Sequence, residues 1–275
     1  MMLTQDTLSN YFTIADSTNS WYESPTNTFD FVNNQSKTLV VTIGDSWTWG
    51  SDIAKHDRTH CIFGRLIAQE LTADWLNLAL CNQGNFWMAT MAEELGALIP
   101  KLHYDKIYVV CTLTEIGRWI NTKFDVYLDY ITMFRDQIKT DFNKLPQLLN
   151  NEAIGRILTA LDYPHVELRI GTNLVDQIGF ENVAPSQILE LPWYQVLGNV
   201  APDHVYVCQF NANGLASMFE FIPKEHHGMY KQWIVDSSTR ADQRLKMLDN
   251  TAMFFKRHPT VSSHRAWARY ILSSL

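Results

Sequence analysis

Short apolar runs rich in β-branched residues alternate along this chain with segments whose apolar residues recur at helical spacing. The runs with strand length and strand composition lie at 39–43, 75–81, 106–113, 166–170 and 204–208. Helical spacing is found at 63–71 and 88–99, and in a longer stretch at 124–161 that Pro146 interrupts. This alternation predicts an α/β domain with a mostly parallel five-stranded sheet, right-handed crossovers and helices on both faces.

The two ends of the chain have different patterns. Residues 1–36 are rich in Ser, Thr, Asn and Asp, and they show neither the strand period nor the helix period. We expect them to form an N-terminal extension that packs its scattered aromatic residues against an α/β domain of residues 37–275. From about residue 216 the pattern is helical, and Ser262 and Ser263 are the expected N-caps of a final helix.

Charge and cysteine content limit the classes of partner and site. The chain has 29 acidic and 22 basic residues, so its net charge is 22 − 29 = −7, and its longest basic run is Lys256–His258. Nucleic acids and anionic lipids attract positive surfaces, so we expect neither as the main partner. No apolar run approaches the roughly 20 residues of a membrane span. The N-terminus has no leader pattern, so a cytoplasmic location is expected. The four cysteines are widely spaced, which favours reduced thiols over disulfides or a zinc site.

Polar residues of the types that take part in catalysis follow several of the predicted strands. In a parallel sheet, ligands bind at the carboxyl ends of the strands, near the point where the strand order reverses. Ser46 follows the first run in Gly44-Asp45-Ser46 and is a candidate nucleophile, although this tripeptide is also ordinary turn chemistry. His258, held by Pro259 before the final helix, is a candidate general base or a structural histidine.

The order and spacing of these segments resemble the SGNH superfamily, also called GDSL-type serine hydrolases, over roughly residues 38–272. That family has a GDS serine after the first strand, a glycine after the second, an asparagine in GxND after the third, and DxxHP near the C-terminus. The segments GDSWTWG, DWLNLAL and TLTEIGR are also similar to SGNH-like proteins of marine bacteriophages. The resemblance implies a three-layer α/β/α sandwich of the flavodoxin-like kind. It also implies a serine esterase or acylhydrolase that needs no cofactor or metal.

The resemblance further implies a role for each matching residue. Ser46 would attack an ester, with O-acetyl groups on carbohydrate and short-chain esters as the expected substrates, and His258 would move the proton. The oxyanion would be held by backbone N–H groups of Ser46 and of Asn82 or Gly84, and by the Thr114 hydroxyl.

Three positions depart from the family pattern. Asn82 stands where the family has its glycine, with Gly84 two residues on, and Thr114 replaces the family's asparagine. Residue 255, the family's acid position, is Phe255. The catalytic set is therefore a Ser-His dyad unless Asp249, Asp236 or another acid completes it. The alternative is a catalytically weak or inactive SGNH-like protein that binds glycan or belongs to a virion. A phage-encoded chain would then lie in the host cytoplasm or in the virion.

Other aromatic and histidine residues support weaker interpretations. Four tryptophans follow the strand-end motifs and are either an aromatic substrate rim or ordinary core residues: Trp47, Trp49, Trp87 and Trp119. His56 and His60 are four residues apart, but no third ligand stands at a recognised spacing, so a metal site is not expected. His264 is expected at the surface. The oligomeric state stays open.

Overall fold

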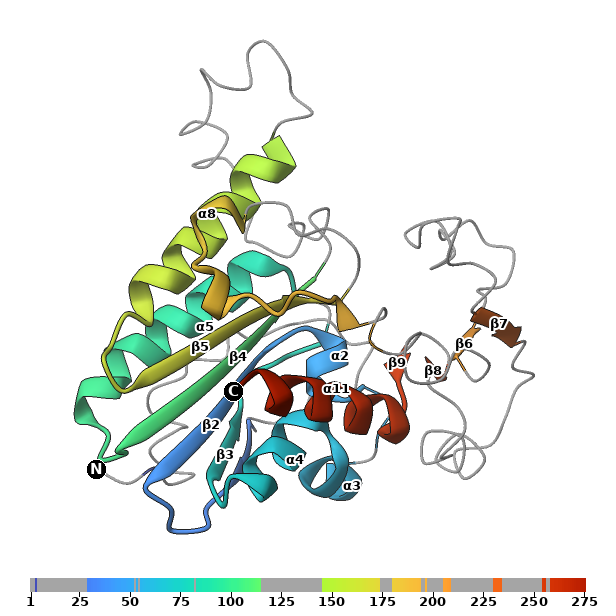
Figure 1. Cartoon of the computed structure of the whole chain (residues 1–275), viewed down its shortest axis with the longest axis horizontal. Helices are drawn as coiled ribbons and strands as arrows, with labels where there is room; N and C mark the ends of the chain where they lie inside the picture. Colours follow the sequence, from blue (N-terminus) through green and yellow to red (C-terminus); the bar gives the residue numbers. More distant parts are fainter. Residues whose placement is uncertain are drawn as a thin grey trace, which may run out of the picture.

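The structure, a computed structural model, centres on one sheet. It describes residues 3, 29–51, 53, 55–81, 83–114, 145–173, 180–193, 196, 205–208, 230–233, 254–255 and 258–275. The strands of the central sheet are β1 (Asp30–Val32), β2 (Thr38–Gly44), β3 (Asp74–Asn77), β4 (Lys106–Leu113) and β5 (Val166–Thr172). They lie in the order β1-β3-β2-β4-β5, as Figure 1 shows. Strands β2 to β5 are parallel and β1 is antiparallel to β3, so the prediction of a mostly parallel five-stranded sheet is confirmed.

The fifth strand of this sheet is not the one that the sequence predicted. The run at 204–208 forms β6 (Val205–Cys208), which pairs in parallel with β7 (Tyr230–Trp233) in a separate two-stranded sheet. The fifth place belongs to β1, which lies within the expected N-terminal extension. Three residues are too few to show a strand period, so only pairing with β3 identifies this strand. The division into 1–36 and 37–275 stays a prediction.

Helices connect the parallel strands, except α11 (Val261–Ser274), which comes after the last of them. They are α2 (Ser46–Trp49), α3 (Lys55–Cys61), α4 (Phe63–Glu70), α5 (Asn85–Leu98), α8 (Leu145–Ala160) and α11 (Val261–Ser274), with single 3-10 turns η1 (Ile99–Lys101), η3 (Phe180–Asn182) and η4 (Pro185–Gln187). Pro146 lies in the first turn of α8, where its missing N–H breaks no helical hydrogen bond. Residues 124–144 lie outside the described residues, so the expected interruption of a longer helical stretch at Pro146 stays a prediction.

The C-terminal part also differs from the predicted pattern. The strands β7, β8 (Phe254–Phe255) and β9 (His258–Pro259) fall in the stretch that was expected to be helical. Thr260 is the N-cap of α11, and its side chain accepts a hydrogen bond from the Ser263 N–H. Ser262 and Ser263 therefore lie inside the helix rather than capping it. A threonine before the helix satisfies the same orphan N–H groups that a serine cap would.

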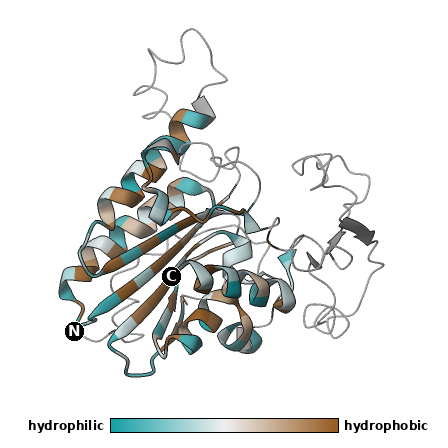
Figure 2. Ribbon diagram, viewed as in Figure 1, coloured by the Kyte–Doolittle hydropathy of each residue, from teal (hydrophilic) through white to brown (hydrophobic). Residues whose placement is uncertain are grey.

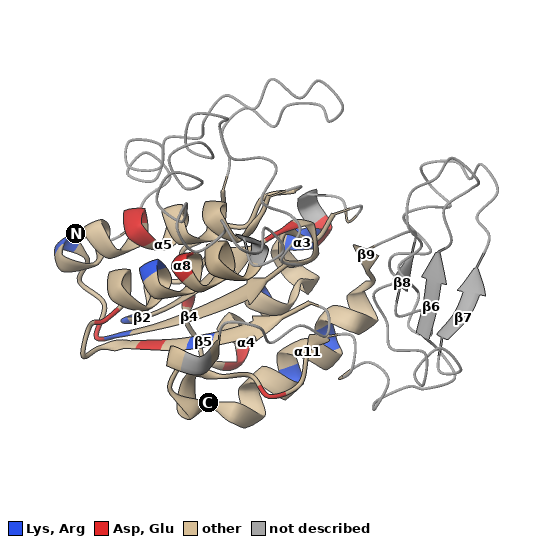
Figure 3. Cartoon of the chain, turned by 90° about the horizontal axis from the view of Figure 1, so that it is seen from above, with Lys and Arg blue, Asp and Glu red and all other residues tan. Residues whose placement is uncertain are grey.

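The core has two halves, one on each face of the sheet. Helices α5 and α8 cover one face and α4 and α11 cover the other, which gives three layers in Figures 1 and 3. Neighbouring residues of a strand enter opposite halves: Val41 and Val109 face α5 and α8, whereas Val40 and Val110 face α4 and α11. Figure 2 shows hydrophobic residues along these strands. The predicted three-layer α/β/α sandwich is confirmed.

The strand order defines one switch point. From β2 the chain moves to β3 on one side and then crosses to β4 on the other side. The segments that leave the carboxyl ends of β2 and β4 therefore diverge, and a site is expected between them. Ser46 follows β2 and Thr114 follows β4, so both candidates lie at this edge of the sheet.

Candidate active site

Ser46 is the first residue of a short helix that starts directly after the central strand. Asp45 is the N-cap of α2, and its carboxylate accepts a hydrogen bond from the Trp47 N–H at 2.9 Å. Gly44 allows the sharp turn, because a Cβ at this position would lie 2.1 Å from Thr48 Oγ1. Ser46 is only 6% exposed. The turn therefore holds this serine at the edge of the sheet with little freedom.

A second side chain holds the same cap. Asn173 lies directly after β5, and its Nδ2 donates to Asp45 Oδ1 at 2.9 Å. Its backbone N–H donates to the Leu113 carbonyl at 3.0 Å. Asn173 was not among the predicted site residues. Like Ser46, however, Asn173 is a polar residue close to the end of a buried apolar run, and this pattern could have identified it.

Thr114 is fixed by a buried amide. The Thr114 N–H donates to Asn85 Oδ1 at 2.9 Å, and Asn85 Nδ2 donates to the Thr114 carbonyl at 3.2 Å and to Asn150 Oδ1 at 2.6 Å. Both hydrogens of the Asn85 amide are therefore engaged. The Thr114 N–H is also engaged, so its hydroxyl is the donor that this residue could offer. Asn85 and Asn150 were missed, because a helical pattern does not reveal which polar residues face each other across two helices.

The loop before α5 is described in part. Gly84 is the N-cap of α5 with φ −96° and ψ 178°, an extended conformation open to any residue. Its carbonyl accepts from the Trp87 N–H at 3.0 Å. Asn82 lies outside the described residues. Which of the two provides an oxyanion N–H stays a prediction.

His258 lies next to the helix that begins with Ser46. It belongs to β9, which is antiparallel to β8 with Phe255 opposite His258, and the side chain is half-buried. Strand β9 contacts α2, so the segments that carry Ser46 and His258 are neighbours although they are far apart in the sequence. Asp249 and Asp236, the candidate acids, lie outside the described residues.

His264 is a second imidazole in this neighbourhood. It is fully buried, which corrects the expectation of a surface position, and its Nδ1 accepts from the Phe63 N–H at 3.3 Å. Burial, together with the smaller effect of the charge on His258, lowers the pKa of His264 to about 3. His264 is therefore neutral near neutral pH.

The tryptophans near the strand ends have different surroundings. Trp47 is buried and packs edge-on against Trp193, with ring centroids 5.6 Å apart, so it is a core residue and not part of a rim. Trp49 is half-buried and lies under the Arg58 guanidinium, 3.9 Å from its ring centroid. Trp87 belongs to α5 and is half-buried against the core on that face of the sheet. Trp119 lies outside the described residues.

Two of the described cysteines, Cys61 and Cys111, have weakly nucleophilic thiols. Burial raises the pKa of the Cys61 thiol, beside Asp57, and of the Cys111 thiol to about 12, so both are protonated and weakly nucleophilic. Within the described ranges, no three His, Cys, Asp or Glu side chains are grouped to hold a metal ion. His60 is exposed, and the His56 side chain lies outside the described residues.

Comparison with known proteins provides one distant similarity. No protein-family model and no curated protein matches the sequence. Among solved structures, the chain is similar to the lipase Lip_vut3 from a goat rumen metagenome, with 8% sequence identity and a TM-score of 0.38. The similarity covers 86% of this chain and 97% of the lipase. A similarity this distant leaves the reaction to be inferred from the residues themselves. In the part of the chain that the structure describes, no helix is long and apolar enough to span a membrane.

Proposed function

We propose that this chain is a serine ester hydrolase of the SGNH type. One observation carries the proposal: Ser46 leaves the central strand at the switch point, and its helix contacts the strand that bears His258. A serine hydroxyl and an imidazole carried on neighbouring segments are the groups that acyl transfer through a serine requires.

The reaction would proceed through an acyl-enzyme. Ser46 Oγ attacks the ester carbonyl, while His258 takes the hydroxyl proton and then delivers it to the leaving alkoxide. Water, deprotonated by the same His258, attacks the acyl-enzyme, and the acid and the free serine are released.

Several donors would stabilise the oxyanion. As the first residue of α2, Ser46 has a backbone N–H with no partner four residues earlier within the helix. A backbone N–H of Asn82 or Gly84 and the Thr114 hydroxyl would complete the set. An impaired donor costs on the order of 10²-fold or more in turnover, so a slow enzyme is expected.

The proposal extends to substrate and setting. O-acetylated carbohydrates and short-chain esters are the proposed substrates, with no cofactor. A cytoplasmic protein is proposed, in the host cytoplasm or the virion if the chain is phage-encoded.

Two observations favour a second candidate function, that of a weakly active or inactive binding or virion protein. Ser46 is 6% exposed, and the family's oxyanion asparagine is replaced by Thr114, whose N–H is engaged. A binding protein would keep this fold without an accessible nucleophile.

The test is hydrolysis of p-nitrophenyl esters of several chain lengths, together with labelling by a fluorophosphonate. We expect Ser46→Ala to abolish labelling, and both Ser46→Ala and His258→Ala to lower kcat/KM by on the order of 10³-fold or more. Ser51→Ala, which changes another buried serine close to α2, is the control and should keep activity. Turnover that persists in Ser46→Ala and His258→Ala would overturn the proposal, and a parent without turnover or labelling would favour the binding protein.

A further inference from the structure

We infer that Asn173 is a positioning residue for Ser46 and acts through the carboxylate of Asp45. This inference rests on the proposed function, in which Ser46 is the nucleophile. Asn173 would not touch the substrate. It would determine where the helix cap places the serine.

Asn173 joins two strand ends that are not neighbours in the sheet. Strand β4 lies between β2 and β5, so the ends of β2 and β5 are separated by two strand spacings, about 9.6 Å. The Asn173 N–H to Leu113 carbonyl bond places its backbone against the end of β4. From there the side chain reaches Asp45, which follows β2. The amide therefore crosses the carboxyl end of β4 at the switch point.

Two donors share the Oδ1 atom of Asp45. Oδ1 accepts from the Trp47 N–H and from Asn173 Nδ2, both at 2.9 Å. Asp45 is 1% exposed and Asn173 is 2% exposed, so bulk water does not replace a lost donor easily. Hydrogen bonds to a carboxylate are stronger than those between neutral groups. Without Asn173, the cap keeps the Trp47 bond but loses a buried hydrogen bond that comes from the end of β5.

Displacement of the cap should appear in the chemical step. Ser46 is the residue next to Asp45, and a shift of about 1 Å in a nucleophile costs on the order of 10²-fold in rate. We therefore expect Asn173→Ala to slow acylation of Ser46 by about 10-fold to 100-fold, mainly through kcat, with little change in KM.

The experiment is a double-mutant cycle on the full chain. The rate constant for labelling of Ser46 by a fluorophosphonate is measured for the parent, Asn173→Ala, Asp45→Ala and the double variant, together with each Tm, and the same cycle is measured for Asn77→Ala with Asp45→Ala. Asn77→Ala is the matched control, because Asn77 is also a buried amide at a strand end, 1% exposed. Asn77 bonds instead to Thr42 Oγ1 at 3.0 Å and to the Ala79 N–H at 3.2 Å.

The inference requires that the double variant be labelled no more slowly than Asp45→Ala alone, whereas the effects of Asn77→Ala and Asp45→Ala multiply. A role in stability alone would lower Tm without this coupling. If Asn173→Ala does not fold, Asn173→Leu keeps a side chain of similar size, removes the donor without adding a charge, and should show the same slow labelling.

Two failures are distinguishable. A parent that is not labelled at Ser46 overturns the proposed function and this inference with it. A labelled parent whose rate is unchanged in Asn173→Ala, or whose Asn173 and Asp45 effects multiply, overturns this inference alone.

Discussion

His264 shows how one buried side chain couples the stability of the protein to pH. Its ring stacks on Phe63, with centroids 6.0 Å apart, and meets Trp193 edge-on at 5.0 Å. This apolar surrounding penalises the imidazolium, so burial holds the pKa at about 3, and His258 contributes in the same direction. The unfolded chain, with a histidine pKa near 6.5, binds more protons than the folded chain between these two values.

The sign of the effect follows. The stability associated with neutral His264 is fully present above pH 6.5 and is lost as the pH falls toward 3. We expect this residue to lower the free energy of unfolding by about 1.4 kcal/mol for each pH unit across this window. Urea unfolding of the parent and of His264→Phe at several pH values measures it, because the variant keeps a ring but cannot titrate. Equal pH slopes in the two proteins would contradict the assignment.

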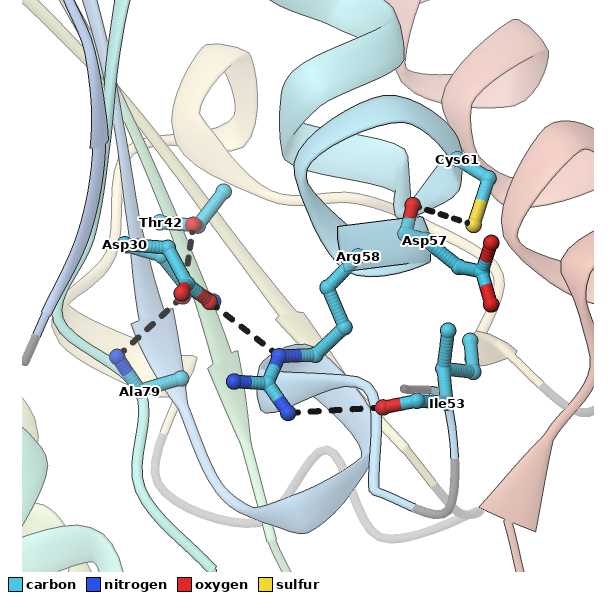
Figure 4. Close-up of polar contacts among 8 residues, drawn as sticks. Asp30, Thr42, Ile53, Asp57, Arg58, Cys61 and Ala79 are labelled. Carbon is cyan, nitrogen blue, oxygen red and sulfur yellow. Dashed lines mark hydrogen bonds and ion pairs between the residues drawn. The ribbon is translucent and has the colours of Figure 1, made fainter. Parts of the chain in front are cut away.

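At the scale of elements, a buried ion pair ties β1 to the helices beside the candidate site. Figure 4 shows Arg58 of α3 between Asp30 and Ile53. Its Nε donates to Asp30 Oδ2 at 3.2 Å and its NH1 donates to the Ile53 carbonyl at 3.3 Å. The guanidinium also covers Trp49, the last residue of α2. The edge strand and the helix that begins with Ser46 are therefore connected through one arginine.

Removal of one partner should be costly here. Asp30→Asn leaves the buried Arg58 charge without compensation, and we expect a loss of about 3 to 5 kcal/mol in the free energy of unfolding. The control is Glu93→Gln, because Glu93 pairs with Arg156 at 2.6 Å but is partly exposed, so a loss of about 0.2 to 1 kcal/mol is expected. Denaturant midpoints of both variants test the difference. Similar losses of unfolding free energy in the two variants would show that the Arg58–Asp30 pair contributes no more to stability than an exposed ion pair.

At the scale of the whole molecule, two cores share one sheet. Ile157 of α8 lies in the core on one face and Ile271 of α11 lies in the core on the other face, both fully buried. Buried apolar side chains of the strands and helices pack against each other on both faces of the sheet, and acidic and basic residues are interspersed over the described helices in Figure 3. Deletion of a methyl group in either core should therefore lower the stability of the one sheet that both cores share.

The corresponding prediction concerns additivity. Ile157→Val and Ile271→Val should each lower the free energy of unfolding by about 0.5 to 1.5 kcal/mol, and the double variant by their sum within about 0.5 kcal/mol. Circular dichroism and tryptophan fluorescence should report the same midpoint, since both cores depend on the sheet. Two separated transitions would mean that the faces unfold independently.

Local pattern was sufficient for the central strands of this protein. The run at 106–113 became β4 with the same bounds, and the run at 39–43 lies within β2, because strands buried on both faces must be apolar throughout. The position of Ser46 after such a strand was predictable for the same reason.

Only the tertiary structure decided which residues meet. Asp45 and Asn173 are 128 positions apart, and their contact depends on β4 lying between β2 and β5. The membership of β1 and the burial of Trp47 and His264 depend equally on distant partners. The periodicity of a sequence indicates on which face of its helix or strand a residue lies. The strand order and the packing of the helices decide which other residue it contacts on that face. The sequence by itself therefore determined the four parallel strands and the candidate nucleophile, and the tertiary structure determined which strand completes the sheet and how Ser46 is held.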